Sequence, residues 1–197
     1  MNRPGLAAVA LLTGALVLTG GAATAAQKSA KDAGGDAAPA ADITRVTVRN
    51  SEKTLTIHVK LHKATSGRSH VVATLTPAAE GAATYVARTV ATGKKVGATL
   101  ETSAPAATDG TGTTDGTGTG TTDGTGTTDG TDTTAATPVD CKGIRASVSS
   151  GRNGQVVIRI PQSCFGADAG TLVAEVATET AAGDVADQAA TLRVKQG

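Results

Sequence analysis

Apolar and polar side chains alternate without a break over residues 54–61. The apolar positions are Leu55, Ile57, Val59 and Leu61. A period of two is typical of a β-strand with one face buried and the other in water. Such a strand needs neighbours for its backbone groups and a second layer for its apolar face. The chain is therefore expected to fold around β-sheets.

Further short, β-branched segments bounded by Gly or Pro lie on both sides of this strand. We predict strands over residues 43–49, 54–61, 70–76, 84–90, 95–101, 144–148, 156–160, 172–178 and 190–195. Tight turns are expected at residues 50–53 and 151–154, where Asn153-Gly154 suits positive φ. Residues 181–190 hold one helical turn at most. About nine short strands without a convincing helix predict an all-β fold, an antiparallel β-sandwich.

A low-complexity segment interrupts this pattern. Residues 108–134 are Thr, Gly and Asp only, with nothing apolar to offset the entropy of ordering, so 102–137 is expected to be a disordered insert. Each flanking half is small, which favours one domain over 42–197 with the insert as a loop rather than a linker. The Thr residues are candidates for O-glycosylation. Asp109, Asp115, Asp123 and Asp129 lie six or eight apart, unlike the acids of calcium loops, which favours a solvated spacer over calcium binding.

The N-terminus has the pattern of a cleavable secretory signal over residues 1–26. Arg3 precedes an apolar run over 6–18, and Ala23-Thr24-Ala25 matches the cleavage consensus. That run is shorter than the roughly 20 residues that span a bilayer. We expect a secreted, extracellular protein with no membrane span after cleavage. Residues 27–41 lack apolar periodicity and are expected to be disordered.

The two cysteines, Cys141 and Cys164, are expected to form a disulfide, as is usual in an exported protein. They flank two predicted adjacent strands, and a hairpin would bring them together. The alternative is a catalytic cysteine, but no His follows Cys141.

Motifs for catalysis or cofactor binding are absent from the sequence, so no catalytic residue, cofactor, metal ligand or enzymatic activity is predicted. His58, His62 and His70 are interpreted as exposed surface residues. His58 and His62 are too far apart along their strand to hold one metal ion, and a His62–His70 pair lacks a third ligand. Glu175 and Glu179 are interpreted as exposed strand residues. The net charge of +1 gives no reason to expect a nucleic-acid partner.

Charge is nevertheless uneven along the chain. Residues 42–100 carry nine Lys or Arg against three acidic residues. A basic first half could contact an anionic cell-wall polymer or an envelope protein through long-range attraction. The alternative is that these basic residues are ordinary solvent-exposed side chains on the strand faces and bind no partner. Aromatic residues are nearly absent, with Tyr85 the one candidate for a surface ring and Phe165 expected to pack on the disulfide.

Three segments together carry a resemblance to a protein group. They are Asp42-Ile-Thr-Arg-Val-Thr-Val48, Cys141-Lys-Gly-Ile144, and the run from Val156 through Pro161-Gln-Ser-Cys164-Phe-Gly166. This pattern resembles small uncharacterised exported β-sandwich proteins of GC-rich Gram-positive bacteria, which are distantly similar to carbohydrate-binding and DOMON-like modules. The resemblance implies a β-sandwich and no functional residue. We expect a secreted, non-enzymatic structural or interaction module of the cell envelope, with a weak carbohydrate-binding module as the alternative.

Overall fold

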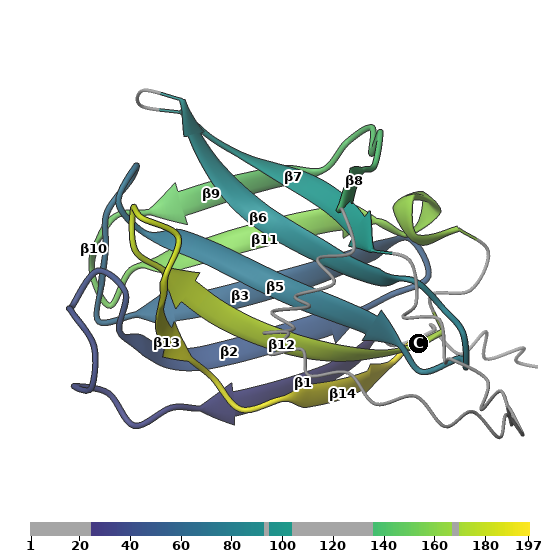
Figure 1. Ribbon diagram of the computed structural model, residues 1–197. Coiled ribbons are helices and arrows are strands. Elements are labelled where there is room, and N and C mark those ends of the chain that lie inside the picture. Colours follow the sequence, from purple (N-terminus) through teal and green to yellow (C-terminus); the bar gives the residue numbers. More distant parts are fainter. Residues whose placement is uncertain (1–24, 93–94, 104–135, 167–169) are drawn as a thin grey trace, which may run out of the picture.

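A computed structural model describes residues 25–92, 95–103, 136–166 and 170–197 of the chain. The fold is all-β and antiparallel, as predicted (Figure 1). One sheet, called sheet I here, contains in spatial order β1 (Ala26–Lys31), β2 (Ile43–Asn50), β3 (Thr54–Leu61), β11 (Gln155–Pro161) and β9 (Arg145–Ser149).

The opposite sheet, called sheet II, is built around β12 and β5. Its order is β13 (Val185–Gln188), β12 (Thr171–Glu179), β5 (His70–Pro77), β6 (Thr84–Thr92), β7 (Lys95–Ser103) and β8 (Thr137–Pro138). β14 (Leu192–Lys195) also pairs with β12. A small ribbon joins β4 (Lys63–Ala64) to β10 (Gly151–Arg152). The described residues thus form fourteen strands, more than the nine expected, because the sequence pattern missed the short ones.

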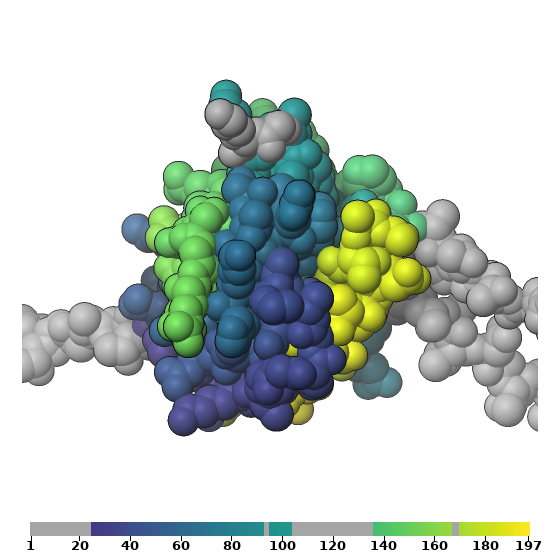
Figure 2. Space-filling view, turned by 90° about the vertical axis from the view of Figure 1, so that its left-hand side faces the viewer, coloured from purple at the N-terminus to yellow at the C-terminus, as the bar shows by residue number. Residues whose placement is uncertain are grey.

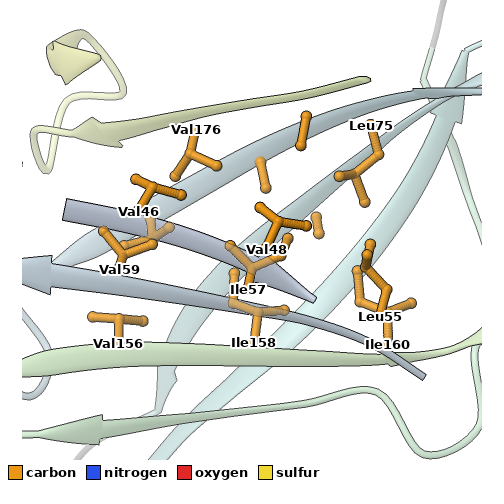
Figure 3. Packing of buried hydrophobic residues seen from close by; sticks show 14 of the residues in the cluster. Val46, Val48, Leu55, Ile57, Val59, Leu75, Val156, Ile158, Ile160 and Val176 are labelled. Carbon is orange, nitrogen blue, oxygen red and sulfur yellow. The ribbon is translucent and has the colours of Figure 1, made fainter. Parts of the chain in front are cut away.

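The core lies between the two sheets and is aliphatic. Side chains of β2, β3 and β11 face those of β5 and β12 (Figure 3). The labelled members are Val46, Val48, Leu55, Ile57, Val59, Leu75, Val156, Ile158, Ile160 and Val176. Most of these side chains are fully buried, so the alternation seen in residues 54–61 reports the buried face correctly.

Strands from both sides of the Thr/Gly/Asp segment contribute to each sheet. In sheet I, β11 pairs with β3, and in sheet II, β12 pairs with β5. This interleaving is the arrangement that a loop within one domain requires. Strand β7 continues to Ser103 and β8 begins at Thr137, so the ordered chain reaches slightly into the expected insert 102–137. Residues 104–135 lie outside the described residues.

The expected disorder of residues 27–41 is wrong in the described structure. Residues 26–31 form β1, which pairs with β2 along its whole length. The Ser29 hydroxyl donates to the Val46 carbonyl at 3.0 Å. Composition alone failed here because the open edge of β2 supplies the hydrogen bonds that this polar segment cannot provide for itself. The predicted signal segment lies almost wholly outside the described residues.

Residues 181–190, where the sequence allowed one helical turn at most, contain no helix in the structure. Residues Val185–Gln188 form strand β13, paired with β12 across a bulge. The described helical structure is the short 3₁₀ segment η1 (Gln162–Phe165). None of the described segments forms a helix with the length and hydrophobicity that crossing a bilayer requires.

The disulfide between Cys141 and Cys164 is present, with 5.3 Å between the Cα atoms. It links the segment before β9 to η1, directly after β11. Phe165 is buried beside it, and its ring meets that of Tyr85 edge to face with centroids 5.1 Å apart. The Tyr85 hydroxyl donates to the Phe165 carbonyl at 3.1 Å. The pair closes this end of the core.

Candidate functional site

The outward face of sheet I carries a concentration of positive charge. Six side chains, here called the basic face, project from all five of its strands. They are Lys31, Arg45, Arg49, Lys60, Arg145 and Arg159. All are exposed except Arg45, which is half-buried. They gather here because the cations of β2, β3, β9 and β11 occupy polar positions of alternating strands, which point away from the core, and Lys31 of β1 pairs with Arg45.

Strand register arranges these cations in rows across the sheet. Lys31, Arg45 and Lys60 stand side by side on three neighbouring strands. Four residues further along, Arg49 lies on a row with Arg159 and Arg145. At the rise of an extended strand the two rows are roughly 13 Å apart, and adjacent strands are about 4.8 Å apart. The face is therefore a grid of charges rather than one cluster.

Negative charge is missing from this face. None of the five strands contains an Asp or Glu. In the part of the chain that the structure describes, no carboxylate lies within 4.0 Å of the six cations. The outward face of sheet II is different, since Arg88 is bridged to both Glu101 and Glu179 there. The two faces of the sandwich thus differ strongly in charge.

His58 sits between the two rows, paired with Thr47 and Val157. Partial burial lowers the pKa of His58, and the nearby Arg159 guanidinium lowers it further, while a hydrogen bond with Gln155 acts in the opposite direction. Burial first, and the positive charge of Arg159 second, therefore disfavour the charged form of the imidazole.

Shallow depressions mark the same surface. One of about 310 Å³ lies over Arg45, Arg49, His58 and Lys60. A second, of about 280 Å³, is lined by Arg49, Thr56, Arg145 and Arg159. Neither is a deep cleft of the kind that encloses a small substrate. The shape suits a ligand that lies along the sheet.

The histidines singled out in the sequence take separate positions. His62 lies just after β3, where its Nδ1 is 4.0 Å from the Asp42 carboxylate, and His70 begins β5. Within the described residues, no three potential metal ligands that include a histidine come together. Tyr85 faces inward and is engaged by Phe165, so it is not a free surface ring. Glu175 and Glu179 project outward from β12, and Glu179 is taken up by Arg88.

The sequence analysis missed a second group of candidate site residues. Oxygens of Asp36, Asp42 and Asp187 lie within 4.8 Å of one another at one end of the sandwich. Two of these residues lie six apart in the sequence, but Asp187 is far away along the chain. The close spacing of the acids in residues 32–42 is a weak signal, and the disorder expected of residues 27–41 gave no reason to bring them together. The acids of the Thr/Gly/Asp segment lie outside the described residues.

No protein-family model, curated protein or solved structure matches this chain. The resemblance to exported β-sandwich proteins therefore stays a prediction. The chemistry of this surface is that of its guanidinium and ammonium groups, which donate hydrogen bonds and attract anions.

Proposed function

We propose that this chain is a non-enzymatic binding module that acts outside the cytoplasm and holds an anionic cell-wall polymer on the basic face. The observation that carries the proposal is the grid of six cations on five strands that contain no acidic residue. The disulfide is in keeping with an oxidising compartment outside the cytoplasm.

A repeating polyanion fits this grid better than a single small anion. The two rows of cations are roughly 13 Å apart, which is too far for one phosphate but suits successive charges of an extended chain. Each contact on so exposed a face is weak in salt solution, so several must act together. A polymer meets this condition because its charges are already linked.

The alternative of neutral-sugar binding receives no support from the described surface. Stacking on sugar rings needs exposed aromatic side chains, and Tyr85 is engaged with Phe165. The wall polymers that the basic face fits are those with phosphate or carboxylate groups along the chain.

Binding to walls tests the proposal directly. The mature protein is expected to co-sediment with purified Gram-positive cell walls at about 20 mM NaCl and to be released at about 300 mM, because salt screens exposed charges. Removing the phosphate polymers from the walls by acid extraction should abolish the retention. The double variant Arg49→Glu/Arg159→Glu should bind about tenfold more weakly or worse.

The matched control is Arg193→Glu/Lys195→Glu. It changes the net charge equally but alters exposed outward positions of β14 on sheet II. This control should keep most of the wall binding. Equal loss in both double variants would show a net-charge effect and overturn the assignment to this face. Preferential binding to duplex DNA over extracted wall polymer would instead identify a nucleic-acid partner and contradict the proposal.

A further inference from the structure

The acidic group at the end of the sandwich joins two distant parts of the chain. Asp36 and Asp42 belong to the connection between β1 and β2, and Asp187 belongs to β13 in the last part of the sequence. Figure 2 shows this end, with the purple connection packed against the yellow C-terminal segment. One oxygen from each carboxylate lies within 4.8 Å of the other two. Asp32 is close enough for its charge to act on Asp187.

Burial makes this arrangement costly without a cation. The Asp42 side chain is only 3% exposed, and its Oδ1 is buried without a hydrogen-bond partner. Asp32 Oδ2 is likewise buried and unpartnered. A buried carboxylate oxygen without a hydrogen-bond partner loses its hydration, and no protein contact offsets that cost. Carboxylates this close together also repel one another. No Lys or Arg of the described residues lies within 4.0 Å of the group; the one neighbouring base is His62.

Backbone amides fix the carboxylates in position. Asp42 Oδ2 accepts a hydrogen bond from the Gly35 N–H at 2.9 Å. Asp187 Oδ2 accepts from the Ile43 N–H at 2.6 Å, and its Oδ1 accepts from the Gln188 N–H at 2.7 Å. Burial raises the pKa of the Asp187 carboxyl, and the charges of Asp32 and Asp36 raise it further, against the effect of these hydrogen bonds. The group is thus held together against its own repulsion.

The donor set selects the class of ion. All the converging atoms are carboxylate oxygens, which hard cations prefer, whereas zinc sites are built mainly from nitrogen and sulfur. Calcium bonds to oxygen at about 2.3–2.6 Å, so two ligands on opposite sides of one ion are about 4.8 Å apart. A flexible loop with several carboxylates suits calcium better than the strict octahedron of magnesium.

We propose that Asp36, Asp42 and Asp187 bind one calcium ion, with Asp32 at its margin, and that the ion ties the β1–β2 connection to β13. The site is independent of the basic face, since none of the six cations belongs to it. Its role is structural: calcium that binds the folded state alone stabilises that state, and the stabilisation grows with the logarithm of the calcium concentration above the dissociation constant. The affinity expected of an extracellular site is a dissociation constant of about 10⁻⁴ to 10⁻³ M.

Calcium alone is the probe for the test, added to the full mature protein after treatment with a chelator. Calorimetric titration with CaCl₂ should show saturable binding, and the midpoint of thermal unfolding should rise with calcium concentration. Circular dichroism follows the unfolding, since the chain contains no Trp. The variants Asp36→Asn and Asp187→Asn should each weaken binding about tenfold or more and remove the thermal shift.

The matched control is Asp184→Asn, which neutralises an exposed acid in the β12–β13 hairpin just before β13. It should bind calcium as the unchanged protein does. Asp36 is exposed, so its variant is expected to fold even if Asp187→Asn does not. Binding that persists unchanged in Asp36→Asn would place the ion elsewhere, for instance on the Asp residues of the Thr/Gly/Asp segment, and overturn the proposal. Absence of heat and of any thermal shift at millimolar calcium would also overturn it.

Discussion

His58 shows at the scale of one residue how the basic face acts on its surroundings. Its ring lies on a sheet face where every charged neighbour is positive. These neighbours are Arg45 and Arg49 on β2, Lys60 on β3, Arg145 on β9 and Arg159 on β11. Burial and Arg159 lower the pKa of His58, so the ring reports the local potential. An anion seated nearby would raise that pKa.

We expect a histidine titration followed by NMR to place the His58 pKa below the ordinary histidine value of 6.5. Arg159→Ala should raise the pKa, though not fully, because burial also lowers it. Adding polyphosphate should raise it in the unchanged protein. A His58 pKa that ignores both the substitution and the polyanion would contradict this account of the face.

The lowered pKa of His58 also makes the stability of the folded protein depend on pH in a defined direction. Because the folded state disfavours the charged imidazole, the unfolded chain binds more protons below pH 6.5. The contribution of His58 to stability is therefore fully present above pH 6.5 and is lost as the pH falls from there toward the folded pKa.

At this scale the sequence predicted part of the candidate site. The excess of basic residues over 42–100 was visible, and Arg45, Arg49 and Lys60 belong to it. That Arg145 and Arg159 complete the grid depends on β11 pairing with β3, which no local pattern specifies. The acidic group escaped prediction for the same reason, since Asp187 joins Asp42 only through the packing of β13.

Among the elements, the turn before β11 is set by one glycine. Gly154 follows Asn153, which has a positive φ of 53°, as the Asn-Gly pair suggested. A Cβ at Gly154 would lie 2.7 Å from the Ala64 Cβ and 2.9 Å from the Gly151 carbonyl oxygen, and even closer to the Ser149 carbonyl. The Leu61 N–H also donates to the Gly154 carbonyl at 3.0 Å. The turn is thus pressed against the end of β3.

Gly154→Ala is expected to destabilise the protein by about 1–3 kcal/mol, the usual cost of forcing an atom into a packed site. Chemical unfolding followed by circular dichroism would measure the change. Gly97→Ala provides the comparison, because the nearest atom to its added Cβ is the Val90 carbonyl oxygen at 3.9 Å. Equal stability of the two variants would show that the turn can move without cost.

At the scale of the elements, a strand could be predicted where its apolar and polar residues alternate clearly. The long alternating strands were located to within a few residues, because burial of one face leaves a clear period of two. Strands β1, β4, β8, β10 and β13 were missed, since they are held by backbone pairing to a neighbour and none has a run of alternating, fully buried apolar side chains. Such edge pairing leaves little trace in the sequence.

In the whole molecule, the disulfide is the one covalent link between segments distant in sequence within the described structure. It spans 23 positions. A loop of this length corresponds to about 3 kcal/mol in the chain-entropy treatment. That is a substantial fraction of the stability usual for a single domain.

The double variant Cys141→Ser/Cys164→Ser is therefore expected to unfold at a temperature lower by about 6–12 °C than the oxidised protein. Differential scanning calorimetry would measure the shift. The unchanged protein, heated after reduction, should behave like the variant. An unfolding temperature unaffected by both treatments would mean that the strand pairing of β9 with β11 suffices without the sulfur link.

Because each sheet combines strands from both halves of the chain, the order in which strands are synthesised limits when the sheets can be completed. A ribosome delivers β3 and β5 early, but their partners β11 and β12 follow about 90 residues later. Until then two apolar strands have open edges, and neither layer can close. The sandwich therefore cannot be completed until nearly all of the chain has emerged. A protein that folds this late is easily kept extended, which is the condition that passage through a narrow translocation pore demands.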